Sequence, residues 1–134
     1  MPSTETCQTK AFEHALSAFL QSKTGSVPVR IWGCSDQALQ SARVAIYCHA
    51  EKETSPELGR QILKAAVTVR TAATVDTDRS LLDDWCARTE ALIGTADLDL
   101  GTGCAIICEG WGVVQLTADS FLVRSLALRV FIHF

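Results

Sequence analysis

The chain has 134 residues, of which 48% are hydrophobic and 20% are charged, and its formal net charge is −3. This length suits one domain over residues 1–134, with a polar lead at 1–7, and the apolar content excludes a disordered chain. The net charge is negative, and Lys and Arg are not concentrated on one face as they are in nucleic-acid-binding proteins. Residues 1–10 are polar, so we expect no secretory signal and an intracellular protein. Arg124 and Arg129 interrupt the longest apolar stretch, so we expect no membrane span.

The first predicted element is an amphipathic helix over residues 8–24. Gly25 suits the position after a helix end, and Pro28 prevents the helix from continuing. The apolar side chains that recur at helical spacing are Phe12, Ala15, Leu16, Phe19 and Leu20.

Three strands are predicted next. Residues 27–33 form a short strand, residues 34–41 a polar loop, and the alternation around residues 43–49 a half-buried strand. The charged segment 51–59 connects this strand to a long one over residues 60–73. The core face of the long strand is predicted to carry Gln61, Leu63, Ala65, Val67 and Val69.

A second helix follows, with Asp76 or Thr77 as its N-cap and Gly94 at its end. Trp85 falls on its apolar stripe, so we expect the indole in the core. Residues 95–103 form a loop, and a strand over 104–115 follows, with Gly110 and Gly112 marking a bulge or bend. A turn at residues 116–120 leads into a last strand over 121–134.

The elements therefore follow the order α-β-β-β-α-β-β. This order predicts an α+β fold with a mostly antiparallel sheet and both helices packed on one face.

The chain has six cysteines, and with no secretory signal we expect them to be free thiols. Cys104 and Cys108 share a strand face but lie about 13 Å apart there, too far for one zinc ion. Cys48 and His49 are consecutive strand residues, so they point to opposite faces and do not form a nucleophile–base pair. We predict no catalytic, cofactor-binding or metal-binding residues and no cofactor.

The informative feature is an apolar surplus on the sheet. Trp32, Tyr47, Ile62 and Ala66 lie on the face that the two helices should not cover, and the last strand is apolar on both sides. Because monomers rarely expose large apolar patches, we predict that this second face is an interface. The alternative is that loops 34–41 and 95–103 fold over it.

Three stretches in this order carry a family resemblance. The helix AFEHALSAFL runs into VPVR, the long strand reads AAVTVRTAATVDTD, and the helix LLDDWCARTEALIG follows. The pattern resembles the tail terminator proteins of long-tailed bacteriophages, or closely related tail-completion and neck proteins.

The resemblance implies a structural virion protein and not an enzyme. Its copies would form a ring, commonly a hexamer, at the head-proximal end of the tail, assembled in the host cytoplasm. The ring would end tail-tube polymerisation and join the tail to the head connector. Its partners would be itself, the tail tube protein and the connector protein, with DNA passing through the lumen without specific binding and no membrane contact.

Seven residues are candidates for the interface of such an assembly. They are Trp32, Tyr47, Ile62, Arg70, Glu51, Lys52 and Glu53. Two other functions stay open: a head–tail connector or minor tail subunit, and a small thiol-dependent enzyme or ligand-binding domain.

Overall fold

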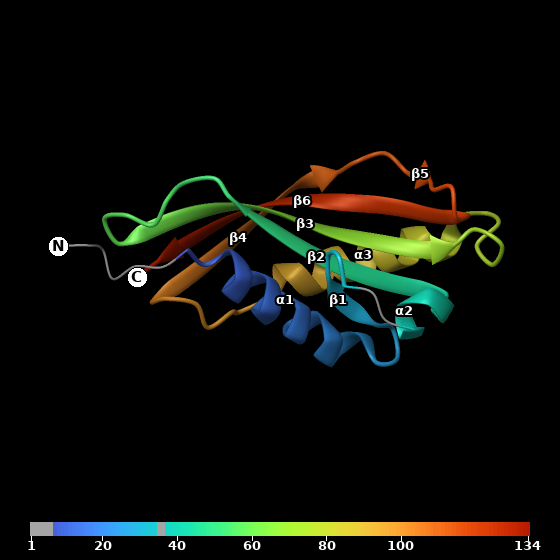
Figure 1. The fold of residues 1–134 in the computed structure, drawn as a ribbon, viewed down its shortest axis with the longest axis horizontal. Coiled ribbons are helices and arrows are strands. Elements are labelled where there is room, and N and C mark those ends of the chain that lie inside the picture. The colour runs from blue at the N-terminus through green and yellow to red at the C-terminus, as the bar shows by residue number, and fades with distance from the viewer. Residues whose placement is uncertain (1–6, 35–36) are drawn as a thin grey trace.

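The computed structural model describes residues 7–34 and 37–134, and it places two long helices against one side of a twisted sheet (Figure 1). The helices are α1 (Thr9–Thr24), α2 (Gln37–Ser41) and α3 (Ser80–Gly94). The strands are β1 (Val29–Ile31), β2 (Val44–Lys52), β3 (Arg60–Ala72), β4 (Gly103–Trp111), β5 (Gln115–Leu116) and β6 (Phe121–His133). The α+β class is confirmed. No helix in the described part of the chain is both long enough and apolar enough to cross a bilayer.

The sheet has the strand order β1-β2-β3-β6-β4, and the short β5 also pairs with β6. The β1–β2 pair is parallel, and the pairs β2–β3, β3–β6, β4–β6 and β5–β6 are antiparallel. The prediction of a mostly antiparallel sheet is therefore confirmed, although the parallel β1–β2 pair makes the sheet mixed. β3 and β6 lie at its centre and pair over thirteen positions, from Arg60↔His133 to Ala72↔Phe121.

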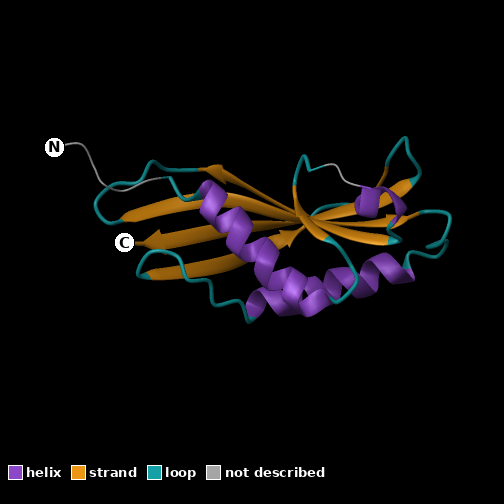
Figure 2. Cartoon of the chain, turned by 60° about the horizontal axis from the view of Figure 1, so that its bottom comes forward, coloured by secondary structure: helices purple, strands orange, loops and turns teal. Residues whose placement is uncertain are grey.

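Helices α1 and α3 cover one face of this sheet, as Figure 2 shows. α1 contacts β1 and β2, whereas α3 contacts β3, β6 and β4. The predicted core face of β3 is confirmed, because Gln61, Leu63, Ala65, Val67 and Val69 are all buried. The apolar stripe of α1 is confirmed at its centre, since Phe12, Leu16 and Leu20 are at most 1% exposed.

Two glutamines fix α1 to the sheet through their amide groups. Gln21 accepts a hydrogen bond from the Val29 N–H (2.9 Å) and donates to the Val27 carbonyl oxygen (3.0 Å), which holds β1 beside the end of α1. The buried Gln61 accepts from the Gln8 N–H (2.9 Å) and donates to a backbone carbonyl before β3. A buried amide is tolerated here because its polar atoms are paired.

The start of α3 depends on Asp76, although the helix begins later than predicted. The buried Asp76 carboxylate accepts from the N–H groups of Leu81 (3.0 Å) and Leu82 (2.9 Å) and from the Thr71 hydroxyl (3.0 Å). It therefore satisfies donors that a helix start leaves unpaired. The prediction that Asp76 or Thr77 occupies the N-cap position is wrong, because that position belongs to Arg79, whose φ is 67°.

Four other expectations require correction. Residues 37–41 form α2, where a loop was predicted; the segment Gln37–Ser41 contains Ala and Leu, which favour a helical turn. The 51–59 connection is shorter than predicted because β2 continues through Lys52. The strand predicted over 104–115 ends at Trp111 and resumes as β5. Trp85 is half-buried at the edge of the core and not inside it.

Two glycines occupy positions that other residues would not tolerate. Gly101 has φ 56°, and a Cβ atom there would lie 2.0 Å from the His133 carbonyl oxygen, which accepts the Thr102 N–H. Gly110 has φ 130° and lies where the β4–β6 register shifts between Cys108 and Gly110. The predicted bulge is therefore confirmed at Gly110, which such irregular backbone favours.

Candidate functional site: the open face of the sheet

The sheet face opposite α1 and α3, here called the open face, carries a large apolar surface. The strand registers place its side chains, because residues directly opposite each other in a pair point to the same side. Its apolar members are Ala45, Tyr47, Ile62, Ala66, Ala72, Phe121, Val123, Ala127, Phe131, Ala105 and Ile107. Ala45, opposite Arg70, is fully buried, whereas the others keep some exposure and Ile107 is 52% exposed.

The alternative that two loops cover this face is wrong for one of them and partly right for the other. In loop 95–103, Leu98 and Leu100 are buried in the core on the helix side. At the other end of the sheet, Arg70 on the open face donates a hydrogen bond to the Leu39 carbonyl oxygen of α2. α2 therefore lies against one end of the open face and leaves the rest uncovered.

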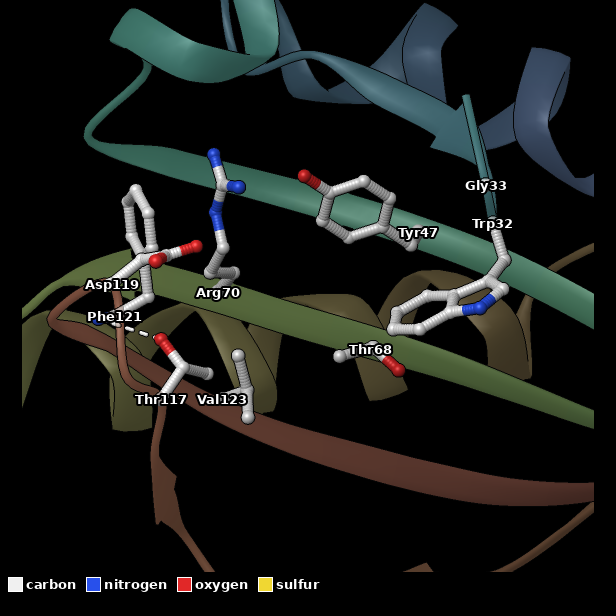
Figure 3. A pocket seen from close by; sticks show the side chains of 9 residues that line it. All are labelled: Trp32, Gly33, Tyr47, Thr68, Arg70, Thr117, Asp119, Phe121 and Val123. Atoms are coloured by element: carbon white, nitrogen blue, oxygen red, sulfur yellow. Dashed lines mark hydrogen bonds between the residues drawn. The ribbon is translucent and has the colours of Figure 1, made fainter. Parts of the chain in front are cut away.

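A hollow of about 350 Å³ lies at the α2 end of the open face. The Arg70 guanidinium lies between two rings, with its carbon 4.0 Å from the centre of Phe121 and 5.5 Å from that of Tyr47. Trp32, 59% exposed, meets Tyr47 edge to face with ring centres 5.7 Å apart. Figure 3 shows the four side chains lining one surface, with Asp119 on the Phe121 side. Stacking of this kind favours a guanidinium over an ammonium group.

The Arg70 Nε atom is buried and has no hydrogen-bond partner among the described residues. The hollow thus combines aromatic surfaces with one cation, Arg70, and one carboxylate, Asp119.

Charged residues occupy the opposite end of the open face. Arg129 pairs with Glu53 (3.2 Å) and approaches Glu109 (3.9 Å). Glu51 pairs with the His49 ring (3.1 Å), and Lys52 is exposed at the end of β2. Of these pairs, His49–Glu51 is solvent-exposed and contributes little to folding, whereas Arg129–Glu53 is partly buried; both affect which partners the surface accepts.

The predicted interface residues fall into two groups. The structure brings Trp32, Tyr47 and Arg70 together at the hollow, and it places Ile62 farther along the same face. Glu51, Lys52 and Glu53 lie at the far end of β2, away from the hollow. Their role in assembly stays a prediction.

Phe121 and Asp119 line the hollow but were not predicted as site residues. Phe121 was the first residue of the last predicted strand, yet nothing in that strand indicated which other strand it pairs with. The pairing of Ala72 with Phe121 across β3 and β6 brings the ring to Arg70.

The thiols differ in ionisation. Burial raises the pKa of Cys48 to about 12, with help from the Glu13 charge, and raises the pKa values of Cys86 and Cys104 to about 11. Burial also raises the pKa of the exposed Cys108. All six cysteines are free thiols.

Cys7 is the exception, because its pKa is lowered. Partial burial opposes ionisation there, but hydrogen bonds from Thr9 and Gln61 and the charge of Lys52 outweigh it. The Gln61 side-chain amide donates to Cys7 Sγ at 3.4 Å.

The two candidate motifs, Cys104 with Cys108 and Cys48 with His49, have the geometry predicted for them. Cys104 and Cys108 both lie on β4, opposite Ile132 and Leu128. Cys48 is buried, whereas His49 lies beside Glu51 on the other face. Within residues 7–34 and 37–134, no three His, Cys, Asp or Glu side chains gather as metal ligands would.

Comparison with known proteins reveals a shared fold. No protein-family model matches the sequence, and no curated protein does. A solved structure whose name states no function is similar over 93% of this chain and 92% of its own, with a TM-score of 0.62 and 17% identity. At this identity the likeness concerns the fold alone: the same α+β arrangement exists in another solved protein.

Proposed function

We propose that this chain is a structural subunit of a bacteriophage tail, and that its copies form a ring at the head-proximal end. The ring ends polymerisation of the tail tube and joins the tail to the head connector. The proposal rests on the resemblance of the element pattern to tail terminator proteins and on one observation, the uncovered open face.

The open face supports self-assembly because its composition differs from that of an ordinary solvated sheet surface. An antiparallel sheet with one solvated face normally alternates apolar and polar residues. Here the uncovered side of β6 carries Val123, Ala127 and Phe131, interspersed with Ser125, Arg129 and His133, and β4 adds Ile107 opposite Arg129. Burying such side chains against another copy is favourable at about 25 cal/mol per Å² of apolar area.

The charge of the subunit agrees with a ring around passing DNA. A net charge of −3 per copy gives an assembly that repels the phosphate backbone. DNA can then move through the lumen without being held there.

Mass measurement by light scattering tests the proposal, together with negative-stain electron microscopy. A ring gives a multiple of the 14.5 kDa subunit mass, expected to be about sixfold by analogy with the family. Closed rings should be visible in the micrographs. A protein that stays monomeric at every concentration up to the millimolar range would overturn the proposal.

A second candidate is a thiol-dependent enzyme, for which Cys7 is the natural choice: it is exposed, accepts a hydrogen bond from the Gln61 side chain (3.4 Å) and has a lowered pKa. A catalytic thiol reacts unusually fast with alkylating agents at neutral pH. Iodoacetamide kinetics followed by mass spectrometry decide between the two. If Cys7 reacts at the rate of the exposed Cys34, the enzyme alternative fails.

A further inference from the structure

The turn between β2 and β3 presents an apolar side chain to solvent. Leu58 is 88% exposed, more than any other large apolar residue in the described chain. Its φ is 52°, in the left-handed region that non-glycine residues rarely adopt. The turn is nevertheless well defined, because Glu57 and Arg60 exchange two backbone hydrogen bonds of 3.0 Å each. The Leu58 side chain is thus held outward on a defined support.

The turn lies at the start of β3, and the hollow lies near the other end of this strand, where Thr68 and Arg70 line it. The long strand β3 joins them, since it begins at Arg60 and carries Arg70 ten positions later. Ten residues of strand span about 33 Å. Leu58 therefore cannot reach the hollow of its own chain, and any contact between the two requires a second copy.

The turn and the hollow are complementary in chemistry. At about 350 Å³, the hollow is near the small end of ligand pockets, and its aromatic walls suit an aliphatic side chain. Arg70, which lines the hollow, supplies a cation. Beside Leu58, Glu57 is exposed and forms no ion pair with any described residue. Asp119 also lines the hollow and places a second carboxylate there.

We infer that the Glu57–Leu58 turn of one copy inserts into the Trp32–Tyr47–Arg70–Phe121 hollow of the next copy. Leu58 packs against the rings, and the Glu57 carboxylate approaches the Arg70 guanidinium. This inference rests on the proposed ring and specifies one of its contacts. The contact is heterologous, joining two different patches, which is the kind that closes rings by rotation.

Site-directed cross-linking tests the contact, because Cys34 is exposed and follows Gly33 at the edge of the hollow. The background is Cys7→Ser with Cys108→Ser, which removes the two other exposed thiols. Leu58→Cys in this background is treated with a short bismaleimide. The matched controls are the same protein with Cys34→Ser, and Leu116→Cys in place of Leu58→Cys, since Leu116 is also exposed.

We expect a ladder of covalent products at multiples of 14.5 kDa with Leu58→Cys, lost with Cys34→Ser and absent with Leu116→Cys. If light scattering shows multimers but Leu58→Cys forms no product, the docking inference is overturned and the ring stands. If the protein is monomeric throughout, the ring itself fails. If the covalent products end at the dimer, the contact between the turn and the hollow is supported but the ring is contradicted.

Association without cross-linker provides a second measurement. Leu58→Asp should weaken self-association about ten- to hundredfold, because it removes a buried leucine from the contact. Asp119→Asn should strengthen association, because it removes from the lining of the hollow a carboxylate with the same charge as Glu57. An unchanged dissociation constant for Leu58→Asp, measured by sedimentation, would overturn the inference.

Discussion

The guanidinium of Arg70 on β3 lies 4.0 Å from the centre of the Phe121 ring on β6, and this stacking builds the hollow on the open face. The two residues are far apart in sequence and meet because β3 and β6 pair along their whole length. The same guanidinium contacts Tyr47 on β2, so one side chain joins three neighbouring strands. A residue in this position affects both folding and the surface offered to a partner.

Arg70→Ala should lower the free energy of unfolding by about 1–2 kcal/mol, because it removes two ring contacts and the packing of the alkyl chain. Arg88→Ala is the matched control, since Arg88 stacks on Trp85 at 4.9 Å on the solvent side of α3. We expect the control to cost under about 1 kcal/mol. Urea unfolding measures both, and equal losses would show that the Arg70 stack has no special role.

Asp76→Ala should cost about 2–3 kcal/mol, because two N–H groups of α3 and the Thr71 hydroxyl lose their acceptor. Asp78→Ala is the control, since Asp78 is exposed and accepts hydrogen bonds from the local Ser80. Its loss should be far smaller than that of Asp76→Ala, as is usual for surface substitutions. Thermal melts compare the two variants. Similar melting temperatures would contradict the capping role of Asp76.

Trp85→Ala would cost about 3–5 kcal/mol if the indole lay in the core, as the helical spacing suggested. The half-buried position found for it lowers the expected cost to about 1–2 kcal/mol, in proportion to the area it buries. Leu82→Ala, fully buried on the same helix, should cost about 2–5 kcal/mol. Urea melts in which Trp85→Ala is the more damaging variant would contradict this placement.

Ile62→Glu should weaken assembly far more than folding, because Ile62 lies on the open face. We expect at least about a tenfold rise in the dissociation constant and under about 1 kcal/mol lost from monomer stability. Trp32→Glu should behave alike. The neighbouring Leu63→Glu faces the core and should prevent folding. Should ring yield and monomer stability fall together for Ile62→Glu, the open face is not an interface.

Alkaline pH should destabilise the fold through Cys48. Burial raises the pKa of this thiol from the ordinary value of 9.0 to about 12, so above pH 9 the unfolded chain loses a proton that the folded chain retains. The stabilisation from the protonated Cys48 is therefore fully present below about pH 9 and is lost as the pH rises toward 12. In this range the free energy of unfolding should fall with a slope approaching 1.4 kcal/mol per pH unit, about the value for one proton.

Cys48→Ala provides the control, because it removes this proton while other alkaline titrations continue. Its stability should be lower near neutral pH but should fall less steeply above pH 9 than that of the parent. Urea unfolding between pH 8 and pH 11 compares the slopes, in steps of about one unit. If the free energy of unfolding falls with the same slope in both proteins, the raised pKa of Cys48 is contradicted.

Local periodicity was enough to predict much of the fold. The alternation of Leu63, Val67 and Val69 identified the core face of β3, and the spacing of Phe12, Leu16 and Leu20 identified the buried stripe of α1. These patterns are readable because each depends on side chains only a few residues apart along a regular backbone.

Tertiary structure decided the order of the strands and therefore the hollow. The parallel pairing of β1 with β2 and the position of β4 outside β6 depend on contacts between distant segments. Trp32, Tyr47 and Arg70 could be assigned to a second face from alternation, but their meeting with Phe121 could not. The alternation of residues along a strand determines on which face of the sheet a side chain lies. Only the pairing and register of the strands determine which side chains lie next to it.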